Sequence, residues 1–311
     1  MRILFLTRFF WPHVGGVEKH VEGLSLSLRK KKHRVTILTE KFDKNLKDAE
    51  FVSGVKIIRF SYPKIKYLGI LYIWIWFFKN RKLIEKSDIV HCHDVFIWYL
   101  PFRFLFPRKP VYITFHGWEG VYPIPWKSIL LKRVAVILSK GNICVGKYLK
   151  KYFGIKSTSV TFGAVDTALS SKAVKDKSLT VYVGRLEKDT GLMVFLKRLK
   201  KIGEAKVVFC GDGSLRKECE NYGEVLGFVD PRPYLAKASV CFPSGYLSAL
   251  EAMVNKCEIE LAWDNPLKKD YWAMTPFYKW IKNKDTSSAY NWVIGKTWEK
   301  LADSYLKLWS R

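Results

Sequence analysis

Two short loops of this sequence carry glycines between an apolar run and a helical pattern. The first loop ends at Gly15 and Gly16, and the second begins at Gly184 and Arg185, directly after the apolar residues 179–183. Glycine lets a backbone approach a ligand closely, and the free amides and positive dipole end of the following helix attract an anion such as a phosphate. Because the two loops lie about half the chain apart, they indicate two nucleotide-type domains that face each other across a cleft.

Arg185 is the residue of the second loop best suited to chemistry. It follows a strand and a glycine directly, and a guanidinium there offers a planar fork of donors that suits a diphosphate. A surface salt bridge with Glu187 or Asp189 is the alternative, and spacing alone does not decide between the two.

Residues 244–253, with the sequence SGYLSALEAM, form a second informative stretch. Ser248 is expected to cap a helix whose N-terminal amides face the cleft, and Glu251 follows at the spacing of a capping box. The alternative for Glu251 is a carboxylate that accepts hydrogen bonds from ribose hydroxyls.

Polar residues that follow the predicted strands mark the ligand side of an open parallel sheet. His116 lies between a strand and a glycine, so it is the histidine best placed for a catalytic contact near a sugar. His91 and His93 share one face of a strand, where two imidazoles suit a metal, but no third ligand has suitable local spacing. A metal site is therefore the less favoured interpretation. The polar residues at these strand ends are His91, His93, Asp94, His116, Arg185, Glu187, Lys188, Asp212 and Ser244.

Length and composition indicate an α/β protein of two domains. The chain has 311 residues, of which 49% are hydrophobic, and predicted strands and helices alternate along it. Its six cysteines show no paired spacing, which is typical of a reducing compartment. The first residues predict a strand rather than a signal pattern, so we expect a cytosolic location.

The net charge of +26 indicates an anionic partner, which is nucleic acid, an anionic bilayer or a phosphorylated substrate. The positive residues are dispersed and no RNA-binding motif occurs, which disfavours nucleic acid. The longest apolar run, residues 67–78, has cationic flanks and is too short to span a bilayer, which needs about 20 residues. A buried helix and an interfacial patch are both compatible with this run.

The predicted elements follow hydrophobic periodicity and turn signals. Strands are expected at residues 2–7, 34–39, 55–60, 88–91, 111–115, 142–145, 157–161, 179–183, 205–210, 224–226, 239–242 and 257–262. Helices are expected at residues 17–31, 67–78, 126–138, 146–152, 192–201, 214–220, 231–237, 248–255 and 288–309. The polar stretch 166–177 is the expected linker, so the first domain is expected to span residues 1–168 and the second residues 169–287.

In the order of these motifs the chain resembles retaining glycosyltransferases of the GT-B fold, in glycosyltransferase family 4. The resemblance covers nearly the full length, and the order and spacing of the motifs are more specific than any one motif alone. The matching motifs are GGVEKHV at 15–21, DIVHCH at 88–93, TFHG at 114–117, GAVD at 163–166, VGRL at 183–186, GDG at 211–213, LGFV at 226–229 and LEAM at 250–253.

This resemblance implies an α/β fold of two Rossmann-like domains that face a central cleft. The N-terminal domain would hold mainly the acceptor and the C-terminal domain the nucleotide sugar, while residues 288–311 would pack back on the N-terminal domain as a helix. The catalytic residues would be His116, at the transferred sugar, and Arg185, at the diphosphate leaving group. The donor-binding residues would be Gly16, Gly184, Arg185, Lys188, Gly245, Tyr246, Leu247, Ser248 and Glu251, and the acceptor-side residues Gly15, Glu18, His20 and His93.

Two positions depart from the family pattern. The family usually has a second Glu eight residues before Glu251, where this chain has Pro243. It also usually has a Lys before the glycine of the second loop, where this chain has Thr190. The lost Glu affects sugar recognition, and the lost Lys removes a phosphate cation that we expect Lys188 to replace. A GT-B protein that binds a nucleotide sugar but has lost its activity is therefore the alternative to an enzyme.

The implied reaction moves a sugar from a nucleotide sugar to an acceptor, mainly by stabilising charge on the departing diphosphate. Because no Asp-x-Asp pair lies in a cleft position, we expect no metal and no other cofactor. The positive charge and the aromatic run favour a lipid-linked or glycan acceptor. The protein is then expected in the cytoplasm, bound peripherally to the anionic inner face of the membrane and not to nucleic acid.

Overall fold

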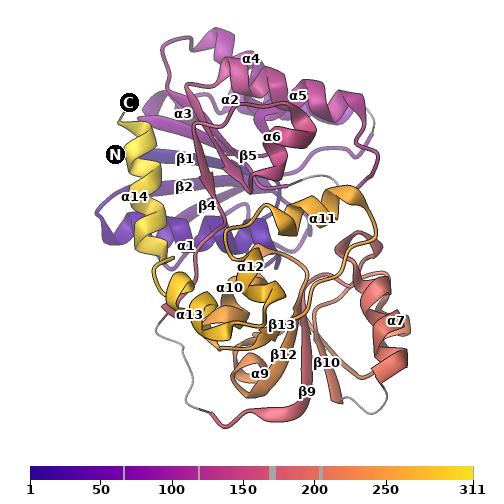
Figure 1. Cartoon of the computed structure of the whole chain (residues 1–311). Helices are drawn as coiled ribbons and strands as arrows, with labels where there is room; N and C mark the ends of the chain where they lie inside the picture. Colours follow the sequence, from indigo (N-terminus) through magenta and orange to yellow (C-terminus); the bar gives the residue numbers. More distant parts are fainter. Residues whose placement is uncertain (66, 118–119, 168–172, 203–205, 311) are drawn as a thin grey trace.

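The computed structural model contains two open sheets, each covered by helices (Figure 1). It describes the chain except for residues 66, 118–119, 168–172, 203–205 and 311. The predicted domain division between residues 168 and 169, and part of the predicted linker, lie outside the described residues.

The first sheet is built by β1 (Arg2–Thr7), β2 (Arg34–Glu40), β3 (Ala49–Val52), β4 (Val55–Phe60), β5 (Ile89–His93), β6 (Val111–Phe115), β7 (Gly141–Val145) and β8 (Ser159–Thr161). Their order is β3-β4-β2-β1-β5-β6-β7-β8, and all neighbours are parallel except β3 and β4. Parallel strands are buried on both faces and therefore appear in the sequence as apolar runs, which is why most of them were predictable. The antiparallel β3 is not among the predicted strands.

Helices cover both faces of this sheet, because successive strand residues point to opposite sides. Those of the first part of the chain are α1 (Gly16–Lys30), α2 (Leu68–Lys79), α3 (Lys82–Lys86), α4 (Phe96–Leu105), α5 (Trp126–Leu138) and α6 (Tyr148–Phe153). Ile3 and Phe5 pack in one core with α1 and the last helix, α14 (Trp298–Trp309). Leu4 and Leu6 pack in the other core with the helices from α2 to α6. Of these helices, α3 and α4 are not among the predicted ones.

The aromatic run predicted as a helix forms α2, and its burial as a core helix is confirmed for one face. Ile73 and Phe77 are buried in the core, whereas Leu71, Tyr72 and Ile75 are about half exposed. One face of α2 therefore belongs to the core and the other lies open at the surface.

The second sheet is parallel throughout, with the order β11-β10-β9-β12-β13. Its strands are β9 (Asp176–Val183), β10 (Lys206–Cys210), β11 (Glu224–Gly227), β12 (Ala238–Pro243) and β13 (Glu258–Ile259). The helices between them are the 3-10 turn η2 (Lys188–Thr190), α7 (Leu192–Ile202), α8 (Arg216–Glu220), α9 (Arg232–Lys237) and α10 (Tyr246–Val254). Residues of α7 and α8 pack in one core of this sheet, and those of α9 and α10 in the other.

The strand order reverses once in each sheet. In the first sheet β1 lies between β2 and β5, and in the second β9 lies between β10 and β12. Loops that leave the strands on either side of such a reversal diverge, which opens a crevice at the carboxyl ends of the strands. The two predicted glycine loops follow β1 and β9, so both lie at a reversal.

The chain ends in α11 (Pro266–Ala273), α12 (Tyr278–Lys282), α13 (Thr286–Val293) and α14. The single helix predicted at residues 288–309 is wrong, because the chain turns at residues 294–297 and Thr297 caps a new helix by accepting a hydrogen bond from Lys300 N. The first of these two helices, α13, packs on α10 and α12, while α14 alone crosses to α1 (Figure 1). The predicted boundary between residues 287 and 288 thus cuts through α13.

Tyr305 fastens α14 to the first domain, and its loss should lower stability. The side chain is fully buried, and its hydroxyl lies 2.9 Å from His20 Nε2 of α1 and 2.8 Å from Thr114 Oγ1 of β6. In Tyr305→Phe the ring is kept, but two buried polar groups lose a partner. We expect the free energy of unfolding, measured by urea denaturation, to fall by about 1–3 kcal/mol.

Tyr72→Phe is the matched control, because Tyr72 on α2 is 55% exposed and loss of its hydroxyl leaves no buried polar group without a partner. Its free energy of unfolding should match that of the wild type. Equal effects of the two substitutions would show that the Tyr305 hydroxyl does not hold α14.

Candidate active site

A cleft of about 340 Å³ lies between the two sheets and is lined from both of them. One wall is the start of α1 with the residues that follow β6, and the other is formed by the turns after β9 and β12. The structure thus brings the two predicted glycine loops together. The predicted site residues that line the cleft are Gly15, Gly16, His20, His116, Gly184, Arg185, Gly245, Tyr246, Leu247, Ser248 and Glu251.

Glycines allow the strand ends of the second sheet to converge at the cleft. Gly184 has a φ of +141°, and a Cβ there would lie 1.6 Å from Ser244 Oγ. A Cβ at Gly211 would lie 1.8 Å from the carbonyl oxygen of Gly184. At Gly16, across the cleft, a Cβ would meet nothing within 4 Å. The first two glycines are thus required by the protein itself, whereas Gly16 leaves open space in which a ligand can approach the backbone.

Arg185 lines the cleft and also forms the ion pair that its spacing allows. Its guanidinium donates to Asp189 Oδ2 at 2.8 Å, and the side chain remains 59% exposed. Glu187, the other possible partner, instead accepts hydrogen bonds from Ser214 N and Ser214 Oγ. Arg185 is therefore held at the cleft by one carboxylate and keeps donors for a ligand.

Lys188, the expected replacement for the family lysine, is exposed and is not among the residues that line the cleft. The reason is the turn η2, in which Thr190 is the buried residue. The Thr190 hydroxyl accepts from Tyr182 OH at 2.9 Å and donates to the Glu187 carbonyl at 2.6 Å. This turn leaves Lys188 on the surface.

The helix after β12 begins earlier than predicted. Gly245 is the N-cap of α10, and Ser248 is its third residue, with Oγ accepting from Gly245 N at 3.3 Å. The predicted caps at Ser248 and Glu251 are therefore wrong. The Tyr246 amide donates to Tyr271 OH at 2.9 Å, so it is not available to a ligand. The amides of Leu247 and Ser248 precede the first bond of the helix and have no intrahelical acceptor.

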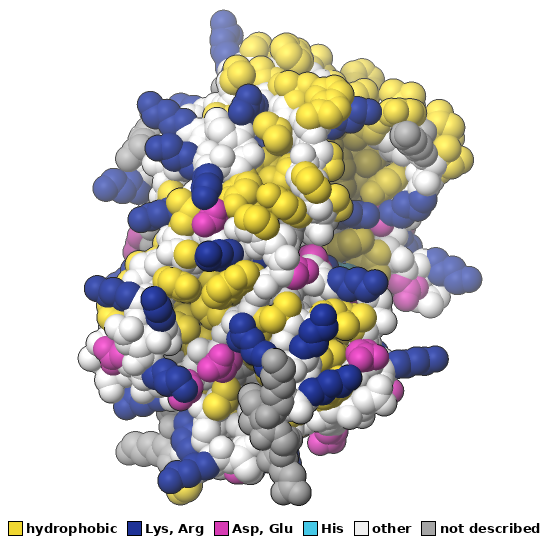
Figure 2. Space-filling model, turned by 45° about the vertical axis from the view of Figure 1, so that its right-hand side comes forward, with side chains coloured by type: hydrophobic (Ala, Val, Ile, Leu, Met, Phe, Trp, Pro, Cys, Tyr) yellow, Lys and Arg dark blue, Asp and Glu magenta, His cyan; other side chains and the backbone are white. Residues whose placement is uncertain are grey.

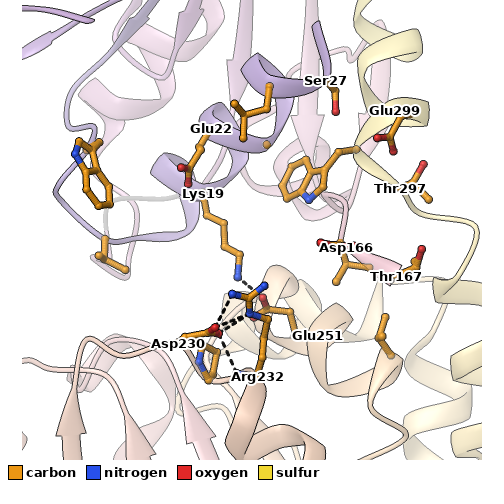
Figure 3. Close-up of a pocket in the computed structure, with 18 of the residues that line it drawn as sticks. Lys19, Glu22, Ser27, Asp166, Thr167, Asp230, Arg232, Glu251, Thr297 and Glu299 are labelled. Atoms are coloured by element: carbon orange, nitrogen blue, oxygen red, sulfur yellow. Dashed lines mark hydrogen bonds and ion pairs between the residues drawn. The ribbon is translucent and has the colours of Figure 1, made fainter. Parts of the chain in front are cut away.

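Glu251 is 7% exposed and forms an ion pair with Lys19, which reaches over from α1 (Figure 3). The pair joins the two domains across the cleft. A larger hollow of about 880 Å³ adjoins the cleft and shares both residues with it. In that hollow Arg232 pairs with Asp230 at 2.5 Å (Figure 3).

His116 lines the cleft, and a buried imidazole supports it. His116 Nε2 lies 2.9 Å from His93 Nδ1, and its backbone N–H donates to Asp94 Oδ1 at 3.0 Å. His91 instead bonds to Thr114 Oγ1 and accepts from Trp309 Nε1, so the two imidazoles predicted on one strand face have separate partners. Within the described parts of the chain, no group of three or more His, Cys, Asp and Glu side chains could hold a metal ion.

The imidazoles of this region are neutral. Burial, with a smaller effect of Lys132, lowers the pKa of His116 to about 3. Burial also lowers the pKa of three neighbouring imidazoles well below 6.5, those of His20, His91 and His93. His116 therefore faces the cleft as an uncharged group that can exchange hydrogen bonds with hydroxyls.

The predicted acceptor-side residues separate into two groups. Gly15 and His20 line the cleft. His93 is buried and contacts His116, and Glu18 lies 3.1 Å from His13 Nδ1; neither lines the cleft.

Lys268 of α11 is a cleft residue that the sequence did not reveal. Its side chain is almost completely buried, and its Nζ donates to the Ser244 carbonyl at 2.7 Å. Nothing in the spacing around residue 268 resembles a known motif, and α11 itself was not predicted. No local sequence motif therefore identified Lys268 as a residue of the cleft.

Comparisons with known proteins give a consistent result. Residues 14–160 match the model of Glycosyltransferase Family 4. An uncharacterised glycosyltransferase of Methanocaldococcus jannaschii is 26% identical, over 81% of this chain and 78% of the relative. Sucrose-phosphate synthase from Thermosynechococcus elongatus has a similar fold, with a TM-score of 0.76, 15% identity, and 99% and 98% of the two chains covered. HepE of Anabaena in complex with UDP-glucose gives a TM-score of 0.70 at 14% identity, with 99% of each chain covered. The predicted fold of two Rossmann-like domains is confirmed.

The buried imidazoles predict that stability falls as the pH is lowered. Each imidazole protonates near pH 6.5 in the unfolded chain and well below that in the folded protein. The stability that they contribute is complete above pH 6.5 and is lost below it, because the unfolded state then binds more protons. Lowering the pH from 7.5 to 5.5 should remove about 1 kcal/mol of unfolding free energy for each imidazole, measured by urea denaturation.

His20→Gln removes one of these groups and should reduce the loss between the two pH values by about 1 kcal/mol. If His20→Gln has the same pH dependence as the wild type, His20 is not held neutral in the folded protein.

Proposed function

We propose, on the premise that this chain is a nucleotide-sugar-dependent GT-B glycosyltransferase of the family 4 type, that it transfers its sugar with retention of configuration. The acceptor that we propose is a lipid-linked or membrane-associated glycan at the cytosolic membrane face. The observation that carries the proposal is that Arg185, the start of α10 and Glu251 meet in one cleft.

The cleft offers positive charge to a departing nucleoside diphosphate. Arg185 uses part of its five N–H donors on Asp189, and the others are available to phosphate oxygens. The amides of Leu247 and Ser248 lie at the positive end of the α10 dipole. Donors that are fixed before the reaction stabilise charge that develops during it, which lowers the barrier.

Glu251, in the same cleft as Arg185 and the start of α10, is suited to bind the ribose of the donor. Its carboxylate is held by Lys19, and the residue lines both the cleft and the larger hollow. Hydroxyls of a ribose can donate to this carboxylate. The hollow beyond it then has room for the base, while the sugar lies toward His116.

Two features of the cleft support retention. Of the described residues, only Asp189 and Glu251 bring carboxylates to the lining, and each is paired with a cation. The lowered pKa of His116 makes its imidazole a weak base. An inverting mechanism needs a base that takes the acceptor proton. The lining favours instead a reaction driven by leaving-group stabilisation, for which we propose no metal ion.

The surface of α2, α4 and α5 supports a membrane-bound acceptor. These helices pack side by side, and Figure 2 shows hydrophobic side chains gathered over the upper part of the molecule with Lys and Arg at their border. Such a surface suits the interface of an anionic bilayer. No helix in the described ranges is long and apolar enough to cross a membrane. The exposed apolar residues of the three helices are Leu68, Leu71, Tyr72, Ile75, Phe78, Phe104, Leu105, Trp126, Leu130, Leu131 and Ile137.

Arg185→Ala tests the leaving-group role. Loss of a charged hydrogen-bond donor costs about 1.5–3 kcal/mol, so the affinity for a nucleoside diphosphate should fall about 10- to 100-fold. Calorimetry with UDP, GDP, ADP and dTDP first identifies the diphosphate that the wild type binds, and donor hydrolysis then measures catalysis. Arg198→Ala, on α7 and away from the cleft, is the control and should bind as the wild type does.

Equal affinity of Arg185→Ala and the wild type would contradict the role of Arg185. If the wild type binds a nucleoside diphosphate but neither hydrolyses nor transfers any nucleotide sugar, the inactive GT-B protein is the correct alternative.

The double substitution Leu71→Ser and Leu130→Ser tests the membrane surface. Each change removes exposed apolar area that would enter the interface, so the two together should weaken binding to phosphatidylcholine vesicles with 30% phosphatidylglycerol by about tenfold. Cosedimentation measures the effect, and added salt should release the wild type. Ile294→Ser, an exposed residue after α13, is the matched control. Equal sedimentation of the wild type with neutral and anionic vesicles would contradict the proposal.

A further inference from the structure

Lys268 is a buried cation in the wall of the cleft. Its side chain is 4% exposed, yet it lines the same cavity as Arg185 and Asp189. An ammonium that is taken out of water is destabilised unless an anion or several acceptors surround it. Asp189 is already paired with Arg185, and no ion pair to Lys268 occurs among the described residues. The site therefore holds a buried ammonium that forms no ion pair with a carboxylate of the described residues.

The contacts of Lys268 hold the ammonium in place without using all of its donors. Nζ donates to the Ser244 carbonyl at 2.7 Å. It also lies 4.5 Å from the ring centroid of Tyr271 and 5.4 Å from that of Trp272, where the ring faces attract a cation. An ammonium has three N–H donors. One is used on the Ser244 carbonyl, so two are left for a ligand.

The position of Ser244 places Lys268 at the phosphate end of the cleft. Ser244 follows β12, one residue before the N-cap of α10, and its side chain lies against Gly184. Arg185 is the next residue after Gly184. The ammonium, the guanidinium and the first amides of α10 therefore all belong to residues that line this one cavity.

The element that carries Lys268 is fixed to both domains. Asn265 caps α11 by accepting from the Lys268 amide at 2.8 Å. Asp270 of the same helix bonds to Lys151 Nζ at 2.5 Å and to Tyr152 OH at 2.8 Å, and both of these belong to α6 of the first domain. A cation on such a helix is pre-organised, which strengthens binding because little is left to be ordered.

We propose that Lys268 is a donor-binding residue that supplies the second cation for the diphosphate, in place of the lysine that this chain lacks at Thr190. The cation enters from α11 instead of from the loop that holds Arg185. This inference rests on the proposed function, since it concerns the leaving group of that reaction. The three donors of the ammonium would then be shared between the Ser244 carbonyl and phosphate oxygens.

Protonation gives a readout that a merely structural lysine would not produce. Burial, with a smaller effect of Arg185, lowers the pKa of Lys268 to about 8, while Asp189 and Asp264 oppose this shift. A diphosphate beside the ammonium favours its charged form and raises the pKa again. Binding near pH 8 therefore takes up protons, and affinity falls as the pH rises above 8.

The test is calorimetry with the full chain and the diphosphate that the wild type prefers among UDP, GDP, ADP and dTDP. Titrations at pH 8 in two buffers of different ionisation enthalpy give the number of protons taken up. Lys268→Met should weaken diphosphate binding at least tenfold and abolish proton uptake, while binding of the corresponding nucleoside stays unchanged. Lys268→Arg should restore much of the affinity. Lys269→Met is the matched control, because Lys269 is the exposed neighbour on the same helix.

The double variant Lys268→Met with Thr190→Lys tests whether a lysine at residue 190 restores the diphosphate affinity lost in Lys268→Met. It returns a cation to the loop position and should recover affinity without proton uptake at pH 8. If Lys268→Met binds the diphosphate as the wild type does, the role of Lys268 is overturned, while weak binding by Arg185→Ala still supports the proposed function. If the wild type binds none of the four diphosphates, both proposals fail. Should Lys268→Met not fold, absence of proton uptake by the wild type overturns the role of Lys268.

Discussion

The reversal of strand order in each sheet is the constraint on which the candidate site depends. It opens a crevice at the carboxyl ends of β1 and β9, and the two crevices face each other in one cleft. The strand ends then approach so closely that Gly184 and Gly211 leave no space for a side chain. This backbone contact brings the turn with Arg185 close to the start of α10, and Lys268 of α11 lines the same cleft. The chemistry is therefore set by topology first and by residue type second.

Ion pairs keep the ligand-binding side chains at the cleft before a ligand arrives. Arg185 is 59% exposed while its partner Asp189 is mostly buried, and Lys19 and Glu251 show the same asymmetry. Water reaches the cation of each pair and screens its charge, whereas the carboxylate is held inside the lining. A diphosphate can bind the donors of Arg185 that Asp189 does not use, and the pair has already restricted the side chain. Such pairs orient the site without closing it.

Local patterns in the sequence predicted the parts of the site that depend on local structure. An apolar run followed by glycine identified Gly184 and Arg185, and an apolar run before His116 identified the other wall. The sequence did not locate the helix start where two nearby residues can act as the N-cap. The N-cap of α10 is Gly245 and not Ser248. Apolar residues recur at helical spacing on both sides of residues 294–297, although the chain turns there and Thr297 caps α14. Lys268 was not predictable, because burial of a lysine depends on what packs around it.

The two departures from the family pattern, Pro243 and Thr190, have opposite effects on the charge of the cleft. Pro243 removes a carboxylate and Thr190 removes an ammonium, so the pair of changes leaves the formal charge of the cleft unaltered. Lys268 adds a cation to that lining, and the described lining has no carboxylate near it beyond the one already bound by Arg185. The diphosphate end of the cleft is therefore more positive than the two changes alone would make it. A cation placed on a rigid helix is also held more firmly than one on a turn. The losses in the loop thus argue for a rearranged donor site rather than for a site that has decayed.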